Sequence, residues 1–85
     1  AGLNTSLGVV LLLADRTAEA VPFLETSRQL EPANPQTAFF LGQAYARNGR
    51  LGDARQVLNA GLQQAEQAGQ TATARNFREI LSLLP

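Results

Sequence analysis

Apolar residues recur along the chain at the three- and four-residue spacing of amphipathic helices. The clearest stripe lies near the C-terminus, where Ala74, Phe77, Ile80, Leu81 and Leu84 share one helical face. The earliest apolar run, residues 7–14, is apolar almost all the way round, which indicates a helix buried on more than one side. The pattern predicts helices at roughly residues 3–14, 17–30, 35–48, 51–68 and 71–84.

Residues that favour helix ends separate these segments. The predicted N-caps are Thr17, Asn34 and Thr71. Pro32 ends the second segment, and Pro35 suits the first turn of the third. Gly49 can take the left-handed conformation just past the end of the third segment, and Gly69 ends the fourth.

The chain contains an internal repeat of 34 residues. Leu7-Gly8 recurs as Leu41-Gly42 at this offset. The same offset relates Arg16 to Arg50, Ala20 to Ala54, Leu24 to Leu58 and Gln29 to Gln63. A fixed period of this length is the signature of a solenoid, in which small units stack because none can bury its apolar face alone. Such proteins offer extended surfaces to partners.

The repeated positions resemble the tetratricopeptide repeat, a helix–turn–helix unit. The second copy carries the pattern at Leu41, Gly42, Tyr45, Gly49, Ala54, Leu58 and Gly61. The first copy carries it at Leu7, Gly8, Leu11, Ala20, Leu24, Ser27 and Pro32. Asp15 stands in place of the inter-helix glycine of the first copy, and Glu66 replaces the closing proline of the second.

This resemblance implies an all-α, right-handed α-solenoid of two repeats, residues 1–34 and 35–68, followed by a closing helix within residues 69–85. The Leu-Gly pair of a third copy would fall at Arg75-Asn76, so the pattern lapses there. We expect the chain to be a fragment of a longer protein or array. Seven arginines without a lysine also favour a GC-rich bacterial gene.

Small residues of the pattern mark close helix contacts, where a larger side chain would overpack the interface by about 1–3 kcal/mol. They are Gly8, Ala20, Ser27, Gly42, Ala54 and Gly61. Tyr45 is expected to pack in the interior with its hydroxyl bonded to a partner.

In the family resembled, the side of each first helix that faces away from its paired helix lines a concave groove for a peptide. Helical geometry places eight candidate partner-binding residues there: Thr5, Val9, Leu12, Leu13, Gln36, Phe39, Gln43 and Arg47. A version of this groove that clamps a C-terminal carboxylate is not matched. Thr5, Val9 and Phe40 replace its lysine and asparagines, and the chain has no lysine.

The apolar residues Val9, Leu12 and Leu13 have two interpretations. They could form an apolar slot for a partner peptide, or an upstream repeat could cover them. If they are left uncovered, the exposed patch favours self-association as a homo-oligomer through the first helix. The alternative function is therefore a purely structural or self-associating end of a longer repeat array that is attached to another functional domain.

Charge and composition argue against other functions. Seven arginines balance seven acidic residues, which leaves no net field for nucleic acid or an anionic membrane. Arg47, Arg50 and Arg55 near one turn are the basis for an RNA-binding alternative, which Asp53 among them disfavours. The run 7–14 is too short to span a bilayer. The compartment stays open.

Catalysis is not expected. The chain has no histidine and no cysteine, so the usual nucleophile–base pairs cannot be built. The acidic residues are scattered, without the spacing of a metal-binding loop. The sequence therefore predicts a protein-interaction module without a cofactor or a metal.

Overall fold

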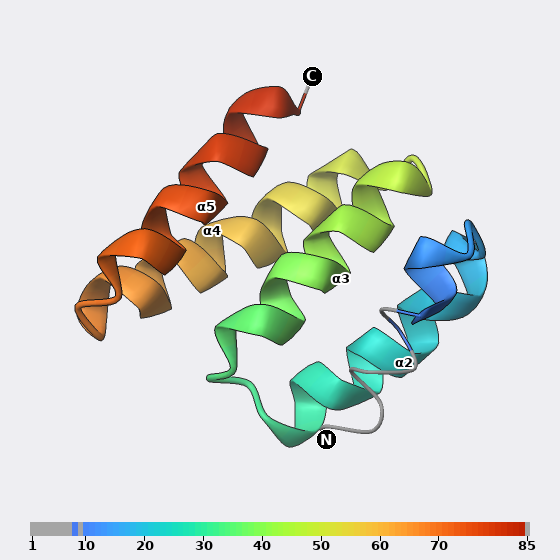
Figure 1. Cartoon of the computed structure of the whole chain (residues 1–85), viewed down its shortest axis with the longest axis horizontal. Coiled ribbons are helices and arrows are strands. Elements are labelled where there is room, and N and C mark those ends of the chain that lie inside the picture. Colours follow the sequence, from blue (N-terminus) through green and yellow to red (C-terminus); the bar gives the residue numbers. More distant parts are fainter. Residues whose placement is uncertain (1–7, 9, 85) are drawn as a thin grey trace.

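The computed structural model describes residues 8 and 10–84 and is helical throughout its regular elements (Figure 1). The helices are α2 (Thr17–Leu30), α3 (Pro35–Arg47), α4 (Leu51–Gln67) and α5 (Thr71–Leu83). Residues 8 and 10–13 are also helical, and residue 14 is already in a turn; residues 3–7 and 9 of the helix expected at 3–14 lie outside the described residues. The described part of the chain contains no strand. The predicted all-α architecture is confirmed.

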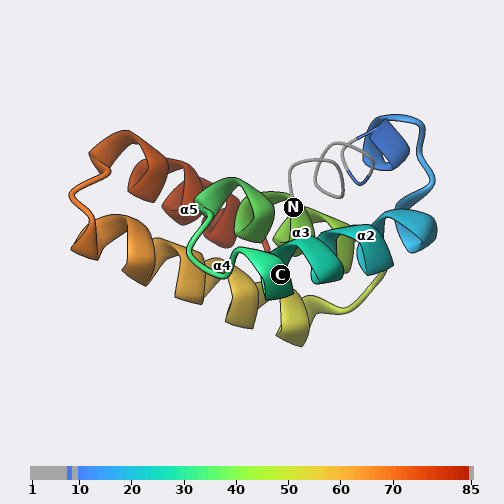
Figure 2. The same cartoon turned by 90° about the horizontal axis from the view of Figure 1, so that it is seen from below.

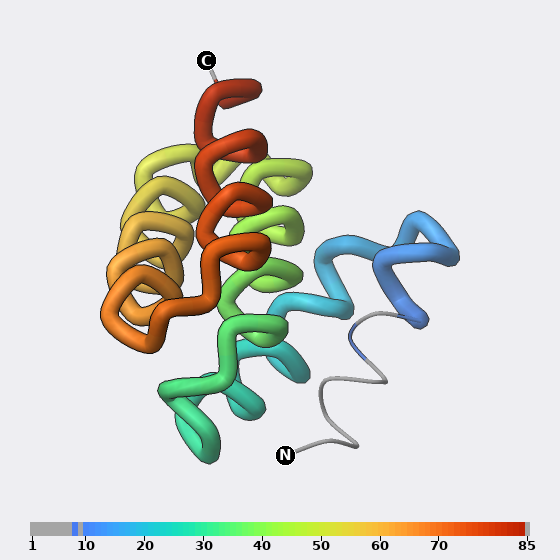
Figure 3. Tube along the Cα trace, turned by 60° about the vertical axis from the view of Figure 1, so that its left-hand side comes forward, coloured from blue at the N-terminus to red at the C-terminus, as the bar shows by residue number. Residues whose placement is uncertain are grey.

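Three tight turns reverse the chain between helices, as the trace in Figure 3 shows. Each turn contains one residue in the left-handed conformation: Asp15 (φ 62°), Gly49 (φ 80°) or Gly69 (φ 71°). The next backbone N–H donates to the carbonyl five residues earlier, at 2.8 Å from Arg16 to Leu11 and at 2.8 Å from Arg50 to Tyr45. These bonds satisfy the free carbonyls at the helix end in the manner of a Schellman motif. Aspartate tolerates this conformation, so it can replace the glycine.

This turn also explains a wrong prediction at two helix starts. Thr17 and Thr71 are the first helical residues, and the N-cap positions are Arg16 and Gln70, neither with a side-chain cap bond. The residue that completes each Schellman turn is itself the N-cap, so the following helix begins one residue early. Asn34, whose loop is longer, caps α3 as predicted: its side chain accepts a bond of 3.0 Å from the Gln36 N–H.

Successive helices pack side by side: α2 on α3, α3 on α4, and α4 on α5. In Figure 2, α4 lies beneath α5, and α2 lies beneath the helical residues that precede it. Two apolar clusters fill the space between them. One joins α2 to α3 around Leu24, Leu41 and Tyr45, and the other joins α4 to α5 around Leu58 and Phe77. The core is therefore continuous from one helix pair to the next.

Glycines set the closest helix contacts, as predicted. A Cβ atom on Gly8 would lie 2.5 Å from Leu24 Cγ, and one on Gly61 would lie 2.6 Å from Phe77 Cε1. A Cβ on Gly42 would overlap the Leu58 side chain in the same way. Because each large side chain occupies the space that the glycine leaves free, the sequence spacing of these pairs fixes how the helices stack.

Candidate functional site

Four of the predicted partner-binding residues lie along one stripe of α3. Gln36, Phe39, Gln43 and Arg47 are spaced so that helical geometry places them on a single face. Gln36 and Arg47 are exposed, whereas Phe39 and Gln43 are half-buried. The other face of α3 carries the buried residues of the core. This stripe is therefore the part of α3 that a partner could reach.

Phe39 is held between two other aromatic rings. Its ring centroid lies 5.8 Å from that of Phe40 and 5.6 Å from that of Phe77, with interplanar angles of 81° and 80°. These edge-to-face contacts are the geometry that aromatic pairs prefer. Phe77 is fully buried on α5, so the contact anchors the Phe39 ring between two helices.

A hollow of about 260 Å³ opens beside this ring, between α3 and α5. From α3 it is lined by Pro35, Gln36, Phe39 and Phe40, and from α5 by Thr73, Asn76 and Phe77. We call it the α3–α5 groove. Its rings are apolar, and its polar groups are amides and a hydroxyl. It can accept an apolar side chain and form hydrogen bonds to a peptide backbone.

The α5 half of this groove was missed by the sequence analysis. There the closing helix appeared only as a cover for the last repeat, because the repeat pattern lapses at Arg75-Asn76. The available signal was the spacing of Thr73 and Asn76, which places both beside Phe77 on a helix.

The remaining predicted site residues have different surroundings. Thr5 and Val9 lie outside the described residues. Leu12 is only 4% exposed and belongs to the core around Leu24 and Leu41, so its placement in a groove is corrected. The reason is packing: the first helical segment turns this side chain onto α2 and α3. Leu13 is 83% exposed.

Arg47 has a structural role. Its Nη1 donates a hydrogen bond of 3.3 Å to the backbone carbonyl of Leu12. A cation at this position suits the negative end of a helix, where carbonyls lack helical donors. Arg47 thus ties the last turn of α3 to the end of the first helical segment and is less available to a partner than Gln36.

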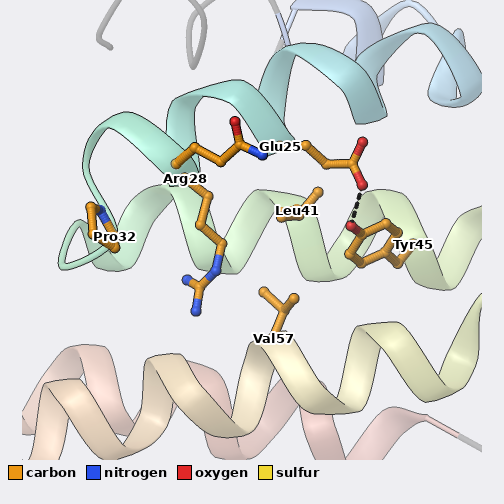
Figure 4. Close-up of a pocket in the computed structure, with 7 residues that line it drawn as sticks. Glu25, Arg28, Pro32, Leu41, Tyr45 and Val57 are labelled. Atoms are coloured by element: carbon orange, nitrogen blue, oxygen red, sulfur yellow. Dashed lines mark hydrogen bonds between the residues drawn. The ribbon is translucent and has the colours of Figure 1, made fainter.

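A second, larger hollow of about 470 Å³ lies on another side of the molecule, between α2, α3 and α4 (Figure 4). It is lined by Glu25, Arg28, Gln29, Pro32, Leu41, Tyr45 and Val57. We call it the α2–α4 hollow. At one end the Tyr45 hydroxyl donates a 2.6 Å hydrogen bond to Glu25.

Tyr45 is held in its neutral form. Burial, and then the hydrogen bond to the Glu25 carboxylate, raise the pKa of Tyr45 to about 12. The Arg50 guanidinium lies 4.4 Å from the ring centroid, in cation–π geometry. The prediction that this hydroxyl would find a partner is confirmed.

Two of the three arginines considered for RNA binding are engaged within the chain. Arg50 bonds to Asp53 at 2.9 Å and covers Tyr45, and Arg47 bonds to Leu12. Among residues 8 and 10–84, no group of three or more acidic, histidine or cysteine side chains could hold a metal ion. Within that same part, no helix combines the length and apolarity needed to cross a bilayer.

Comparisons with known proteins agree on the architecture. A sequence model of the tetratricopeptide repeat matches residues 11–77. A crystal structure of a tetratricopeptide repeat domain protein from Salinibacter ruber superposes with a TM-score of 0.80 at 22% identity, over 89% of this chain and 84% of that one. No curated protein sequence matches.

Proposed function

Because this chain belongs to the tetratricopeptide repeat family, we propose that it binds a peptide segment of a partner protein in the α3–α5 groove. The fold is that of a protein-interaction scaffold, and members of the family generally act without catalysis. We assign residues 1–34 and 35–68 to two repeats and residues 69–85 to a closing helix. In this proposal the closing helix also forms one wall of the binding site.

The observation that carries the proposal is the anchored Phe39 ring flanked by amide side chains. Phe39 is held by Phe77, so it offers a rigid apolar surface that loses little conformational freedom on binding. Gln36 and Asn76 lie on opposite walls, and each can donate to and accept from a peptide backbone. Both are exposed, so they are free to rearrange around a ligand.

The size and charge of the groove define the class of partner. Its volume is below the roughly 300–1,000 Å³ of small-molecule sites, and it suits a single leucine or aromatic side chain. The described residues that line it are all uncharged. We therefore propose an extended segment with one apolar anchor, bound with little dependence on salt, unlike a nucleic acid held through its phosphates.

A matched pair of double variants tests this proposal. Peptides are selected from a random library on the 85-residue chain, and their affinities are measured for Gln36→Ala/Asn76→Ala and for Gln63→Ala/Asn59→Ala. The control replaces the same residue types at exposed positions of α4. We expect enrichment of leucine and aromatic residues, at least about tenfold weaker binding to the groove variant and unchanged binding to the control.

Two results would contradict the proposal. One is a set of selected peptides that bind both double variants equally. The other is a steep loss of affinity between about 0.05 and 0.5 M salt, which would indicate recognition through charge. Phe39→Ala is a poor test because the loss of its contact with Phe77 would also loosen α3 from α5.

Self-association is the second candidate function, and the exposure of Val10 (60%) and Leu13 (83%) favours it. Neighbouring exposed apolar residues mark a surface that another molecule can cover. Light scattering over a concentration series measures the molar mass. A dimer that Leu13→Glu converts to a monomer would support this function, and a concentration-independent monomer of the unaltered chain would exclude it.

A further inference from the structure

Among residues 8 and 10–84, no carboxylate pairs with the guanidinium of Arg28 in the α2–α4 hollow. Its Nη1 is buried, and the described residues offer it no hydrogen-bond acceptor. Three other arginines, Arg16, Arg50 and Arg78, each pair with an acidic side chain. A buried donor without an acceptor is unfavourable, and most strongly so when it carries charge.

The isolation of Arg28 has an identifiable cause. Glu25 precedes it by three residues on α2, a spacing that normally allows an ion pair. The Glu25 carboxylate instead accepts the Tyr45 hydroxyl at 2.6 Å. Figure 4 shows Glu25 directed to Tyr45 at one end of the hollow, while the Arg28 side chain extends towards α4 at the other end. The two charges line the same hollow without pairing.

The surroundings of Arg28 match a carboxylate on a short apolar stem. Leu41, which is 1% exposed, and the half-buried Val57 provide an apolar wall. Gln29 adds an amide to the lining. A planar guanidinium binds a carboxylate through two parallel hydrogen bonds, whereas a neutral amide can accept at only one oxygen.

We propose that the α2–α4 hollow is a second binding site, which takes a glutamate side chain of a partner polypeptide. The carboxylate binds Arg28, and the two methylene groups of the glutamate pack against Leu41 and Val57. Charge complementarity carries this assignment, because the unpaired Arg28 supplies the charge opposite to that of the ligand. The site lies away from the α3–α5 groove and does not depend on the function proposed for that groove.

Nuclear magnetic resonance of the 85-residue chain tests this site with three small probes. N-acetylglutamate α-amide carries only the side-chain carboxylate, N-acetylglutamine amide carries none, and N-acetylleucine carries only a terminal carboxylate. We expect the glutamate probe to shift the Arg28 Nε–H and the Val57 amide in a saturable way. Gln36 and Asn76 in the other groove should not shift. The glutamine probe should bind at least about tenfold more weakly.

Arginine variants provide the controls. Arg28→Gln should abolish saturable binding of the glutamate probe. Arg28→Lys keeps the charge but lacks the paired N–H donors of the guanidinium, so it should weaken binding. Arg55→Gln alters an exposed arginine of α4 and should leave it unchanged. The proposal is overturned if the glutamate probe causes no saturable shift, if the leucine or glutamine probe binds as well, or if Arg28→Gln remains folded and binds normally.

Discussion

The Tyr45 hydroxyl of α3 donates a hydrogen bond of 2.6 Å to the Glu25 carboxylate of α2, and this bond joins two successive helices. Tyr45 is only 7% exposed, and its ring belongs to the core around Leu24 and Leu41. The bond therefore adds a directional contact between α2 and α3 to the apolar packing of this core.

Removal of this hydroxyl should lower stability. Tyr45→Phe keeps the ring and its packing but leaves Glu25 without its donor. We expect a loss of about 1.5 kcal/mol in the free energy of unfolding, since the acceptor is charged. Urea denaturation measures it. Glu25→Gln, which retains an acceptor oxygen, should lose less, and equal stability of Tyr45→Phe and the unaltered chain would contradict the expectation.

Alkaline pH should destabilise the protein through the same residue. The pKa of Tyr45 is raised to about 12 in the folded chain, against about 10 when it is unfolded. The folded chain thus retains a proton that the unfolded chain releases, so this contribution to stability is full below about pH 10 and disappears as the pH rises towards 12.

The chain has one tyrosine and no tryptophan, so the absorbance of tyrosinate reports this titration directly. We expect a midpoint well above that of free tyrosine. Glu25→Gln should lower it only in part, because burial is the larger cause of the shift. A midpoint near 10 in the folded chain would show that the hydroxyl is open to solvent.

Two glycine-to-alanine substitutions should change stability in opposite directions. Gly42→Ala places a methyl group into the Leu58 side chain and should cost about 1–3 kcal/mol. Gly52→Ala meets nothing within 4 Å and should stabilise α4 by up to about 1 kcal/mol. Thermal denaturation compares the two. A Gly42→Ala variant as stable as Gly52→Ala would mean that α3 and α4 are not closely packed.

Alanine substitution at an N-cap should cost more stability where the side chain caps the helix than where it does not. Asn34→Ala removes a side-chain cap and should cost about 1 kcal/mol. Gln70→Ala affects an N-cap position with no side-chain bond and should cost much less. Chemical denaturation of both variants gives the comparison, and similar losses would indicate that the Asn34 bond does not stabilise α3.

The repeat pattern predicted most of the fold because it records packing directly. Gly42 and Leu58 are both pattern residues, and they meet in the structure. The wrong N-cap predictions arose where a backbone turn, rather than a capping side chain, determines where the helix begins. A threonine before an amphipathic segment predicts an N-cap, but at Thr17 the backbone bond from Arg16 to Leu11 starts the helix one residue earlier.

The candidate sites were harder to predict because they depend on residues far apart in sequence. Gln36 and Phe39 could be placed on a free face from helical periodicity. The opposite wall required knowledge that Phe77 fills the space beside Gly61 and brings Asn76 to the groove. No sequence pattern marked Arg28 as a site residue, because its lack of an ion-pair partner depends on the hydrogen bond between Tyr45 and Glu25.

Helix α3 carries its buried residues on one side and its most exposed residues on the other. Its buried side, which includes Ala38, Leu41 and Tyr45, packs against α2 and α4 and tolerates little change in volume. Gln36 and Gln43 on the other side do not belong to either core cluster. Under the proposed function, substitutions there would alter which partner is preferred while the architecture stays the same. The proposed recognition by Gln36 could then evolve separately from the packing of Ala38, Leu41 and Tyr45.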